Sequence, residues 1–260
     1  MVKFWIHLLF RLKHPIKHIY ILKKLTVLAL FICLLFSCNK DTKPLSFKTT
    51  EITKIYNADI NVLLTEATAN NAISNAINTS IKNEIIKAIS NSESIKNLED
   101  ALNEFDTEFV NFKKYFSDRE STWVLNIESE VTYSSSEVLT IALSIYTDKG
   151  GAHGNDTITF LNFNPNTGSL FALEDIINDV VAFKNLAEKH FNIAIDSNTS
   201  ENLSIEDFFF GEPFQLPNNI GFTEDGLVLL YNVYEIASYN QGYTEFVIPT
   251  DILSPYLKVN

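Results

Sequence analysis

Residue types able to carry out chemistry are scarce in the chain beyond residue 37. His153 and His190 are the only histidines there, and no His-Glu-x-x-His or paired-cysteine spacing occurs. A zinc site with three or four nitrogen or sulfur ligands therefore cannot be assembled. The sequence also lacks Gly-x-Ser-x-Gly and a phosphate-cradling glycine loop. We accordingly assign no catalytic residue, no metal ligand and no cofactor.

Carboxylates are the exception to this scarcity. The chain has 32 Asp and Glu residues, so a pair with a glycosidase-like separation is inevitable, yet no sequence spacing singles one out. Two function classes stay open for that reason. The chain is either a non-enzymatic binding protein, which we favour, or a glycan-processing hydrolase that uses carboxylates near His153.

One segment, residues 147–156, combines three glycines with His153. Glycine permits positive φ angles and close backbone approach, and an exposed imidazole can contact a ligand or donate a proton. His153 and Asn155 are therefore candidate ligand-binding residues. The simpler interpretation is a wide β-hairpin in which His153 bonds to the neighbouring backbone. A calcium loop from Asp148, Asn155 and Asp156 is disfavoured, because the EF-hand spacing is missing.

A second segment, residues 231–243, carries four tyrosines between two expected strands. Tyrosines on exposed loops provide rigid, amphipathic contact area that suits a protein or a sugar. We take Tyr239 and Tyr243 as further candidate ligand-binding residues. The alternative is that the rings clamp the loop onto a sheet, with Tyr234 and Tyr239 toward the core and Tyr243 exposed.

The N-terminal segment has the pattern of a lipoprotein signal. An apolar run from Leu25 to Phe36 follows basic residues and ends at Ser37-Cys38, which is typical of a lipoprotein processing box. The run is too short to span a bilayer core of about 30 Å, so a short transmembrane anchor is the less favoured alternative. We expect residues 1–37 to be a cleaved signal peptide, Cys38 to carry the lipid, and residues 38–46 to be a tether.

Lipid attachment at Cys38 predicts a location in the cell envelope. Asn39 is not the aspartate that retains many Gram-negative lipoproteins at the inner membrane, so the outer membrane is favoured. Lys40-Asp41 weakly resembles the charged export tags of surface lipoproteins. The two cysteines, Cys33 and Cys38, both lie in this region, so we expect no disulfide in the folded part.

Charge limits the possible partners. Beyond residue 37 the chain has 14 basic and 32 acidic residues, a net charge of −18. Such a chain repels phosphate backbones and anionic bilayer surfaces. We therefore expect no nucleic-acid partner and a membrane contact made only through the lipid on Cys38.

Hydrophobic periodicity predicts alternating blocks of strands and helices. In the first half we expect β-rich stretches in 47–65 that meet at 57–59, a helix with isoleucine at every fourth residue in 73–89, and a helix with a Leu/Phe heptad in 95–116. An antiparallel meander is expected over 123–163. In the second half we expect a helix over 173–194, a hairpin at 225–226, a strand over 245–248 and a short helix from residue 250. The heptad could also form a dimerising coiled coil, which is less favoured beside a partner helix.

These blocks predict an α+β fold, with antiparallel sheets, helices packed on one face, and two consecutive helices early in the chain. We expect two domains, 47–168 and 169–260, either separate or joined into one compact unit.

Both chemistry-bearing segments resemble a known domain pair. Gly150-Gly151-Ala152-His153-Gly154-Asn155, followed by Asn-x-x-Thr-Gly at 164–168 and Leu173-Glu174-Asp175-Ile176, is similar to a domain shared by the anti-sigma factor RsiV and the N-terminal region of the peptidoglycan deacetylase PdaC. Tyr-x-Ile-Ala-x-Tyr-x-x-Gly at 234–242 and Val247-Ile248-Pro249 resemble the second domain of the RsiV type. The resemblance spans about residues 47 to 257.

The resemblance implies a binding module more than an activity. RsiV-like proteins use this module to sense lysozyme, and in PdaC-like proteins it accompanies a separate catalytic domain. We expect neither signalling nor deacetylation here, because cleavage before Cys38 removes a cytoplasmic segment and no metal-dependent deacetylase domain follows Asn260. What the resemblance implies for this chain is binding of an envelope glycan, such as peptidoglycan, or of a lysozyme-like protein.

Overall fold

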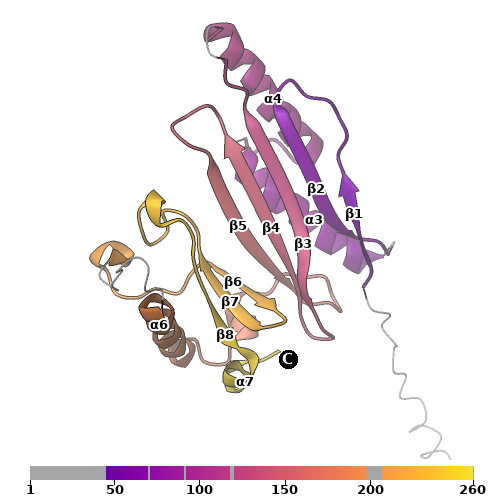
Figure 1. Cartoon of the computed structure of the whole chain (residues 1–260). Helices are drawn as coiled ribbons and strands as arrows, with labels where there is room; N and C mark the ends of the chain where they lie inside the picture. The colour runs from indigo at the N-terminus through magenta and orange to yellow at the C-terminus, as the bar shows by residue number, and fades with distance from the viewer. Residues whose placement is uncertain (1–44, 70, 91, 118–119, 198–206, 260) are drawn as a thin grey trace, which may run out of the picture. The chain divides into compact units, whose positions relative to one another are not determined.

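The computed structural model describes residues 45–69, 71–90, 92–117, 120–197 and 207–259 (Figure 1). The predicted signal peptide at 1–37, the predicted lipidation site Cys38 and residues 38–44 of the predicted tether lie outside the described residues. All the described residues belong to one compact unit that extends from Pro44 to Asn260. Within them, no helix has the length and apolar character that crossing a bilayer requires.

A five-stranded sheet forms the first half of this unit, with the strands in the order β1-β2-β3-β4-β5. Its strands are β1 (Phe47–Glu51), β2 (Asp59–Ala67), β3 (Val124–Ser134), β4 (Leu139–Asp148) and β5 (Asn155–Phe163). Two helices, α3 (Ala72–Ile89) and α4 (Leu98–Tyr115), cover one face of it (Figure 1). The predicted α+β class and the two early helices are confirmed.

One strand pair departs from the predicted antiparallel arrangement. β2 and β3 are parallel, whereas the other neighbouring strands in the sheet are antiparallel. Parallel neighbours need a long crossover connection, and the α3–α4 hairpin lies between these two strands in the sequence. The sheet is therefore mixed. The two helices that cover it also form the crossover connection between β2 and β3.

The helical stripes behave as their periodicity predicts. Ile77, Ile81 and Ile85 of α3 are buried, as are the Leu and Phe positions of the α4 heptad up to Phe109. They form a core with the inward side chains of the sheet and with Trp123, whose ring lies 5.7 Å from that of Phe105. The heptad thus packs inside the domain.

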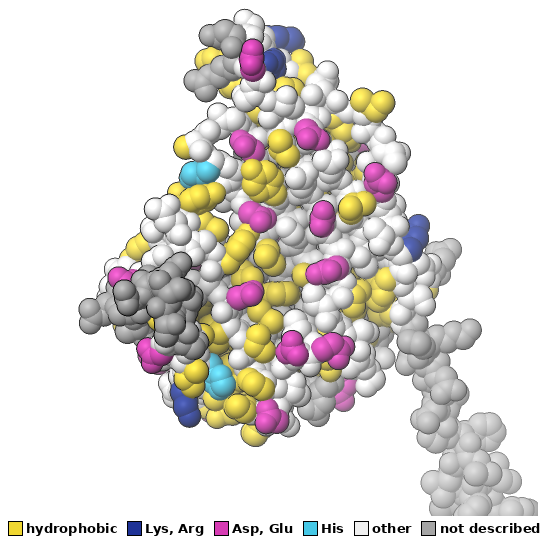
Figure 2. Space-filling model, in the orientation of Figure 1, with side chains coloured by type: hydrophobic (Ala, Val, Ile, Leu, Met, Phe, Trp, Pro, Cys, Tyr) yellow, Lys and Arg dark blue, Asp and Glu magenta, His cyan; other side chains and the backbone are white. Residues whose placement is uncertain are grey.

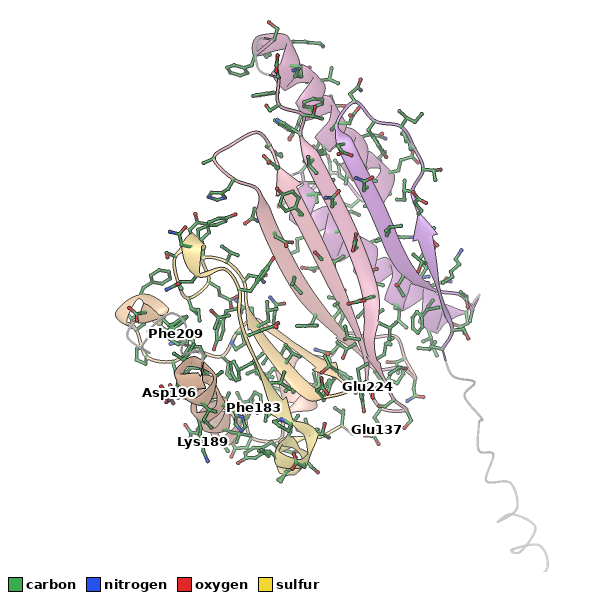
Figure 3. The ribbon with its side chains drawn as sticks, viewed as in Figure 1. Glu137, Phe183, Lys189, Asp196, Phe209 and Glu224 are labelled. Atoms are coloured by element: carbon green, nitrogen blue, oxygen red, sulfur yellow. The ribbon has the colours of Figure 1, made fainter. Side chains whose placement is uncertain are left out.

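A three-stranded sheet with a second hydrophobic core forms the other half. It consists of β6 (Asn219–Thr223), β7 (Gly226–Tyr231) and β8 (Thr244–Pro249), with α5 (Leu173–Ile176), α6 (Val180–Ser197) and α7 (Thr250–Leu253) beside it. In Figure 3, Phe183 of α6 and Phe209 point into this core, whereas Lys189 and Asp196 lie on the outer side of α6.

The single helix predicted over 173–194 is wrong. The chain forms α5, breaks at residues 177–179, and starts α6 at Val180. Asp179 causes the new start, because its Oδ1 accepts hydrogen bonds from the backbone N–H groups of Val181 and Ala182, both at 3.0 Å. A side chain that caps N–H groups in this way begins a helix. Ile177 meanwhile pairs with Leu257 in a β-bridge.

Residues 52–58 form an arch between β1 and β2, where the periodicity predicted further β structure. Ile55 in this arch is 94% exposed. Asp106 of α4 holds the end of the arch, because its Oδ1 accepts hydrogen bonds from the backbone N–H groups of Asn57 (2.6 Å) and Ala58 (2.8 Å). A carboxylate that satisfies backbone donors replaces the missing strand pairing.

Polar side chains join the two halves where β6 lies against β4 and β5. Buried Asn162 accepts a hydrogen bond from the Thr140 hydroxyl and donates one to the Ile220 carbonyl, both at 2.7 Å. The backbone of Phe222 is bound from the five-stranded sheet as well, by Thr132 at 2.9 Å. We call this group of contacts the seam.

Candidate functional site

The structure brings together the two segments that the sequence singled out. The turn between β4 and β5 presents His153, and the connection between β7 and β8 presents Tyr234 and Tyr239. The imidazole of His153 stacks on the ring of Tyr239, with centroids 3.7 Å apart and planes inclined by 23°. The ring of Tyr234 lies 6.3 Å from His153 and 5.6 Å from Tyr239. We call these three residues the ring cluster.

Hydrogen bonds fix the ring cluster. The carbonyl of Gly154 lies 2.9 Å from Nδ1 of His153 and accepts a bond from the Tyr239 hydroxyl at 3.3 Å. A proton on Nδ1 satisfies the first contact, so Nε2 is left as an acceptor for the Tyr234 hydroxyl, which lies 3.4 Å away. The backbone bond expected in the simpler interpretation of His153 is present, and the stack is additional.

The loop that carries Tyr234 is anchored on both sides. The Asn232 amide makes two hydrogen bonds to the backbone of Ile158 in β5, each 2.9 Å long, which imitates strand pairing. The Glu235 carboxylate accepts bonds from the backbone N–H groups of Asn232 and Asn218. Tyr234 between them has a φ of 69°, an uncommon conformation for a residue other than glycine. These contacts hold the tyrosine loop against the five-stranded sheet.

Gly154 is required by its neighbour Tyr146 of β4. A Cβ atom at Gly154 would lie 2.4 Å from Cζ of the Tyr146 ring, much closer than side chains approach one another. The absence of a side chain therefore allows the turn to lie on this ring and to direct its carbonyl at His153 and Tyr239. The glycine-rich composition of residues 147–156 thus has a packing function at one defined position.

Tyr243, a predicted ligand contact, is half-buried. Its hydroxyl is buried and has no well-formed hydrogen bond among the described residues. Burial raises the pKa of this hydroxyl far above its usual range, and the neighbouring Asp156 carboxylate raises it further. Tyr243 therefore remains a neutral phenol at physiological pH.

The expected burial of Tyr234 is wrong, whereas Tyr239 and Tyr243 are both half-buried. Tyr234 was expected toward the core and is 54% exposed, Tyr239 is half-buried, and the hydroxyl of Tyr243 is buried. Tyr231 lies wholly in the second core and donates a hydrogen bond to the Gln215 carbonyl. Sequence reasoning therefore missed Tyr234 as a surface residue of this site. The signal in the sequence that could have indicated its exposure is the pair Asn232 and Glu235, whose side chains shape the turn around Tyr234.

Asn155 does not join the ring cluster. It is the first residue of β5, it is exposed, and its amide donates to the Thr157 hydroxyl on the same strand at 3.3 Å. No carboxylate of the described residues forms a hydrogen bond or ion pair with His153. Nor do three His, Cys, Asp or Glu side chains come together in that part of the chain as they would around a metal ion.

The ring cluster thus offers a partly exposed aromatic surface with a few polar groups at its edge. The imidazole and the Tyr239 hydroxyl contact the Gly154 carbonyl, and the Tyr234 hydroxyl contacts Nε2 of the imidazole. Such a surface can contact an apolar face of a ligand and form hydrogen bonds with its polar edge.

Two family profiles match the chain in succession. Residues 49–156 match the family described as deacetylase PdaC, and residues 163–251 match DUF3298, described as a protein of unknown function. The chain has a PdaC-type region followed by a DUF3298 region. The predicted domain pair is confirmed, and the ring cluster takes His153 from the first region and both tyrosines from the second.

Solved structures share this fold. A DUF3298 family member from Bacteroides fragilis is 19% identical, with a TM-score of 0.64, over 82% of this chain and 93% of that one. A DUF3298 family protein from Pseudomonas aeruginosa is 19% identical, with a TM-score of 0.59, over 84% of this chain and 95% of that one. No curated protein matches the sequence. At this level of identity the likeness concerns the fold alone.

Proposed function

We propose that this chain is a lipid-anchored protein of the cell envelope that binds an envelope glycan without turning it over. The single observation that supports glycan binding is the ring cluster, in which His153 stacks on Tyr239 at 3.7 Å beside the exposed Tyr234. Contacts from both regions of the chain build this surface, so its geometry depends on the PdaC–DUF3298 pairing.

Sugar rings suit such a surface for a physical reason. A pyranose has an apolar C–H face and a rim of hydroxyl groups, so it matches an aromatic face edged with hydroxyls and an imidazole. Tyrosine also loses little side-chain entropy on binding, because it has only two rotatable side-chain bonds. The net charge of −18 beyond residue 37 fits an uncharged or amino-sugar polymer better than a polyanion.

The direct test replaces one ring of the cluster. We expect Tyr239→Leu to weaken binding of soluble peptidoglycan fragments by roughly tenfold or more, because truncating a tyrosine anchor typically costs about 2 kcal/mol. Tyr115→Leu is the matched control, since Tyr115 is 83% exposed at the end of α4. Isothermal titration calorimetry of the wild type and both variants gives the dissociation constants.

Three results would count against the proposal. Equal losses in the two variants would mean that the ring cluster is not the site, and no saturable binding by the wild type would remove the glycan as ligand. Cleaved fragments recovered after incubation would instead support the hydrolase alternative, provided that His153→Ala abolishes the cleavage.

A basic, lysozyme-like protein is the second candidate partner, and charge favours it. The helix-free face of the five-stranded sheet carries exposed acidic side chains on neighbouring strands, including Glu51, Glu128 and Glu130. Figure 2 shows Asp and Glu side chains spread over this view, with Lys and Arg toward its margins. Binding carried by these charges should weaken steeply between 50 and 500 mM salt in a lysozyme pull-down, whereas stacking of a neutral glycan should not.

The anchor is tested separately. We expect Cys38→Ser to release the protein from membranes into the soluble fraction, because it removes the thiol that carries the lipid. Fractionation followed by immunoblotting measures the distribution, and Cys33→Ser serves as the control that leaves the anchor intact. Retention of the Cys38→Ser protein in the membrane fraction would contradict lipidation at this residue.

A further inference from the structure

A cavity in the PdaC-type region lies far from the ring cluster in the sequence and shares no residue with it. Its volume is about 650 Å³, within the range of small-molecule sites, and it lies between the 52–58 arch, β2 and the two helices α3 and α4. Its apolar walls come from four residues, Ile52, Leu64, Leu98 and Leu102. The arch forms one side of it and is tied to α4 through Asp106.

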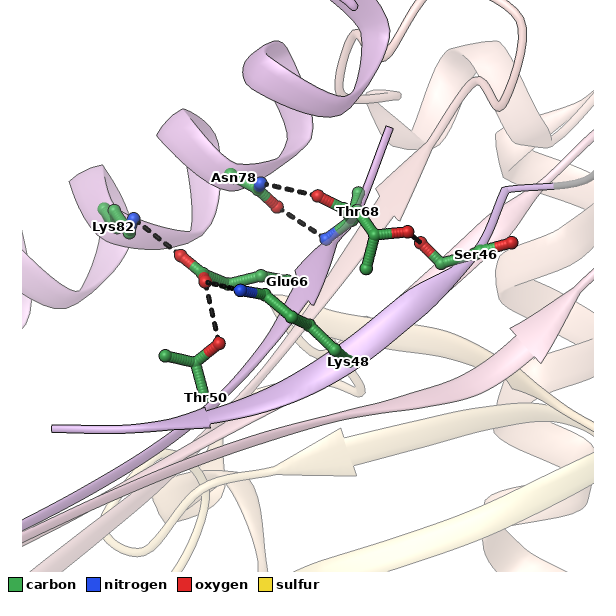
Figure 4. A network of polar contacts seen from close by, with 8 residues as sticks. Ser46, Lys48, Thr50, Glu66, Thr68, Asn78 and Lys82 are labelled. Carbon is green, nitrogen blue, oxygen red and sulfur yellow. Dashed lines mark hydrogen bonds and ion pairs between the residues drawn. The ribbon is translucent and has the colours of Figure 1, made fainter. Parts of the chain in front are cut away.

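Two lysines and two glutamates line the same cavity in pairs. Lys82 lies 2.7 Å from Glu66, and Lys54 lies 3.1 Å from Glu99. The other carboxylate oxygen of Glu66 accepts a hydrogen bond from the Thr50 hydroxyl at 2.8 Å (Figure 4). These donors, with Lys82 first, lower the pKa of Glu66, so this half-buried carboxyl is ionised and satisfied.

The hydrogen-bonding capacity left over at the two lysines consists of donors. An ammonium group has three N–H donors. Among the described residues Lys82 bonds only to Glu66, and Lys54 bonds to Glu99 and Asn103. Each lysine therefore keeps at least one N–H group for a ligand. Both oxygens of Glu66 are already bound, whereas Glu99 uses one oxygen for Lys54 and its exposed side chain leaves the other to solvent.

Tyr56 adds a buried donor to the same wall. Its hydroxyl is shielded from solvent and has no hydrogen-bond partner in the described part of the chain. Burial raises the pKa of this hydroxyl, so it remains a neutral O–H donor. A buried donor without an acceptor is unfavourable, so an acceptor oxygen that reached this hydroxyl would be favoured.

We propose that this cavity binds a small amphipathic carboxylate, with its apolar body along Ile52 and the ring of Tyr56 and its carboxylate between Lys54 and Lys82. The apolar walls select the body, and the unused N–H groups select an anionic, acceptor-only head. This site would be separate from the glycan surface, so either proposal can fail without the other.

The test uses octanoate as the probe and methyl NMR of the full chain. Octanoate should shift the methyl resonances of Ile52, Leu64 and Leu98, which line the cavity, in a saturable way. It should leave those of Leu229 and Ile248, in the second core, unchanged. Octylamine has the same apolar body with the opposite charge and should bind roughly tenfold or more weakly, because it cannot accept charge-assisted bonds from the lysines.

A charge-matched pair of variants completes the test. Lys54→Gln/Lys82→Gln should weaken octanoate binding roughly tenfold or more. The control Lys87→Gln/Lys149→Gln removes two other lysines with glutamate partners and should leave binding unchanged. Thr53→Trp, which fills the mouth of the cavity without changing charge, should also block binding.

Several outcomes overturn the proposal. They are equal binding of octanoate and octylamine, equal losses in the two double variants, saturable shifts in the second core alone, or no saturable shift at all. Circular dichroism melting of each variant separates loss of the site from loss of the fold, and Thr53→Trp keeps the test valid if the Lys82 substitution unfolds the protein.

Discussion

Phe191→Ala is expected to lower the free energy of unfolding by about 3–5 kcal/mol, the usual cost of removing a fully buried phenylalanine. Phe191 is 0% exposed and lies at the centre of the second core. Its ring is 5.3 to 6.0 Å from five other aromatic rings, those of Phe208, Phe209, Phe214, Tyr231 and Phe246. The surrounding rings belong to several elements and cannot all move inward to fill the cavity that alanine leaves. Most of the van der Waals contacts of the Phe191 ring are therefore not recovered.

Urea denaturation followed by circular dichroism measures this effect. Phe210→Ala is the control, because Phe210 directly follows Phe208 and Phe209, two of the rings beside Phe191, but is 69% exposed. It should change the free energy of unfolding by less than about 1 kcal/mol. Similar losses in both variants would show that Phe191 is not the centre of this core.

Asn162→Leu is expected to destabilise the protein by roughly 2–4 kcal/mol, because each buried group left without its partner costs about 1–3 kcal/mol. The change removes both hydrogen bonds of the Asn162 amide, to Thr140 and to Ile220, in the seam. Leucine has the same branched side chain of four heavy atoms as asparagine, but it cannot form either hydrogen bond.

The control for the seam is Asn126→Leu, an exposed amide that bonds to Asn61 on the open face of the sheet. It should cost less than about 1 kcal/mol. Beyond residue 37 the only tryptophan is Trp123, in the first core, so its fluorescence and far-ultraviolet circular dichroism can be compared during urea unfolding. Equal stability of the Asn162→Leu and Asn126→Leu variants would contradict the role given to the seam.

The sequence predicts local structure well wherever one periodicity dominates. The isoleucines of α3 and the Leu/Phe heptad of α4 are buried as predicted, because a helix with one apolar stripe has only one face to bury. The prediction fails where a single polar side chain decides the outcome. Asp179 begins a new helix, and Asp106 replaces strand pairing in the arch through contacts formed only after folding.

The ring cluster was likewise predictable only in part from the sequence. Residue types in 147–156 and 231–243 mark both segments as candidates, but their stacking depends on the seam and on the Asn232 contact with Ile158, 74 residues away. The burial of each tyrosine follows from that docking, so it could not be read from the loop alone. The cavity beside α4 is similar, because Lys54, Glu66 and Lys82 become neighbours only when the arch covers the helices.

Glycan binding at the ring cluster can be tested directly, because the imidazole of His153 is part of the stack. In a proton NMR titration of the full chain with a purified disaccharide-peptide from peptidoglycan, the ring protons of His153 should shift and saturate at the calorimetric dissociation constant. The ring protons of His190, on α6 in the other half of the unit, should not move. Saturable binding that leaves the ring protons of His153 unshifted would contradict glycan binding at the ring cluster.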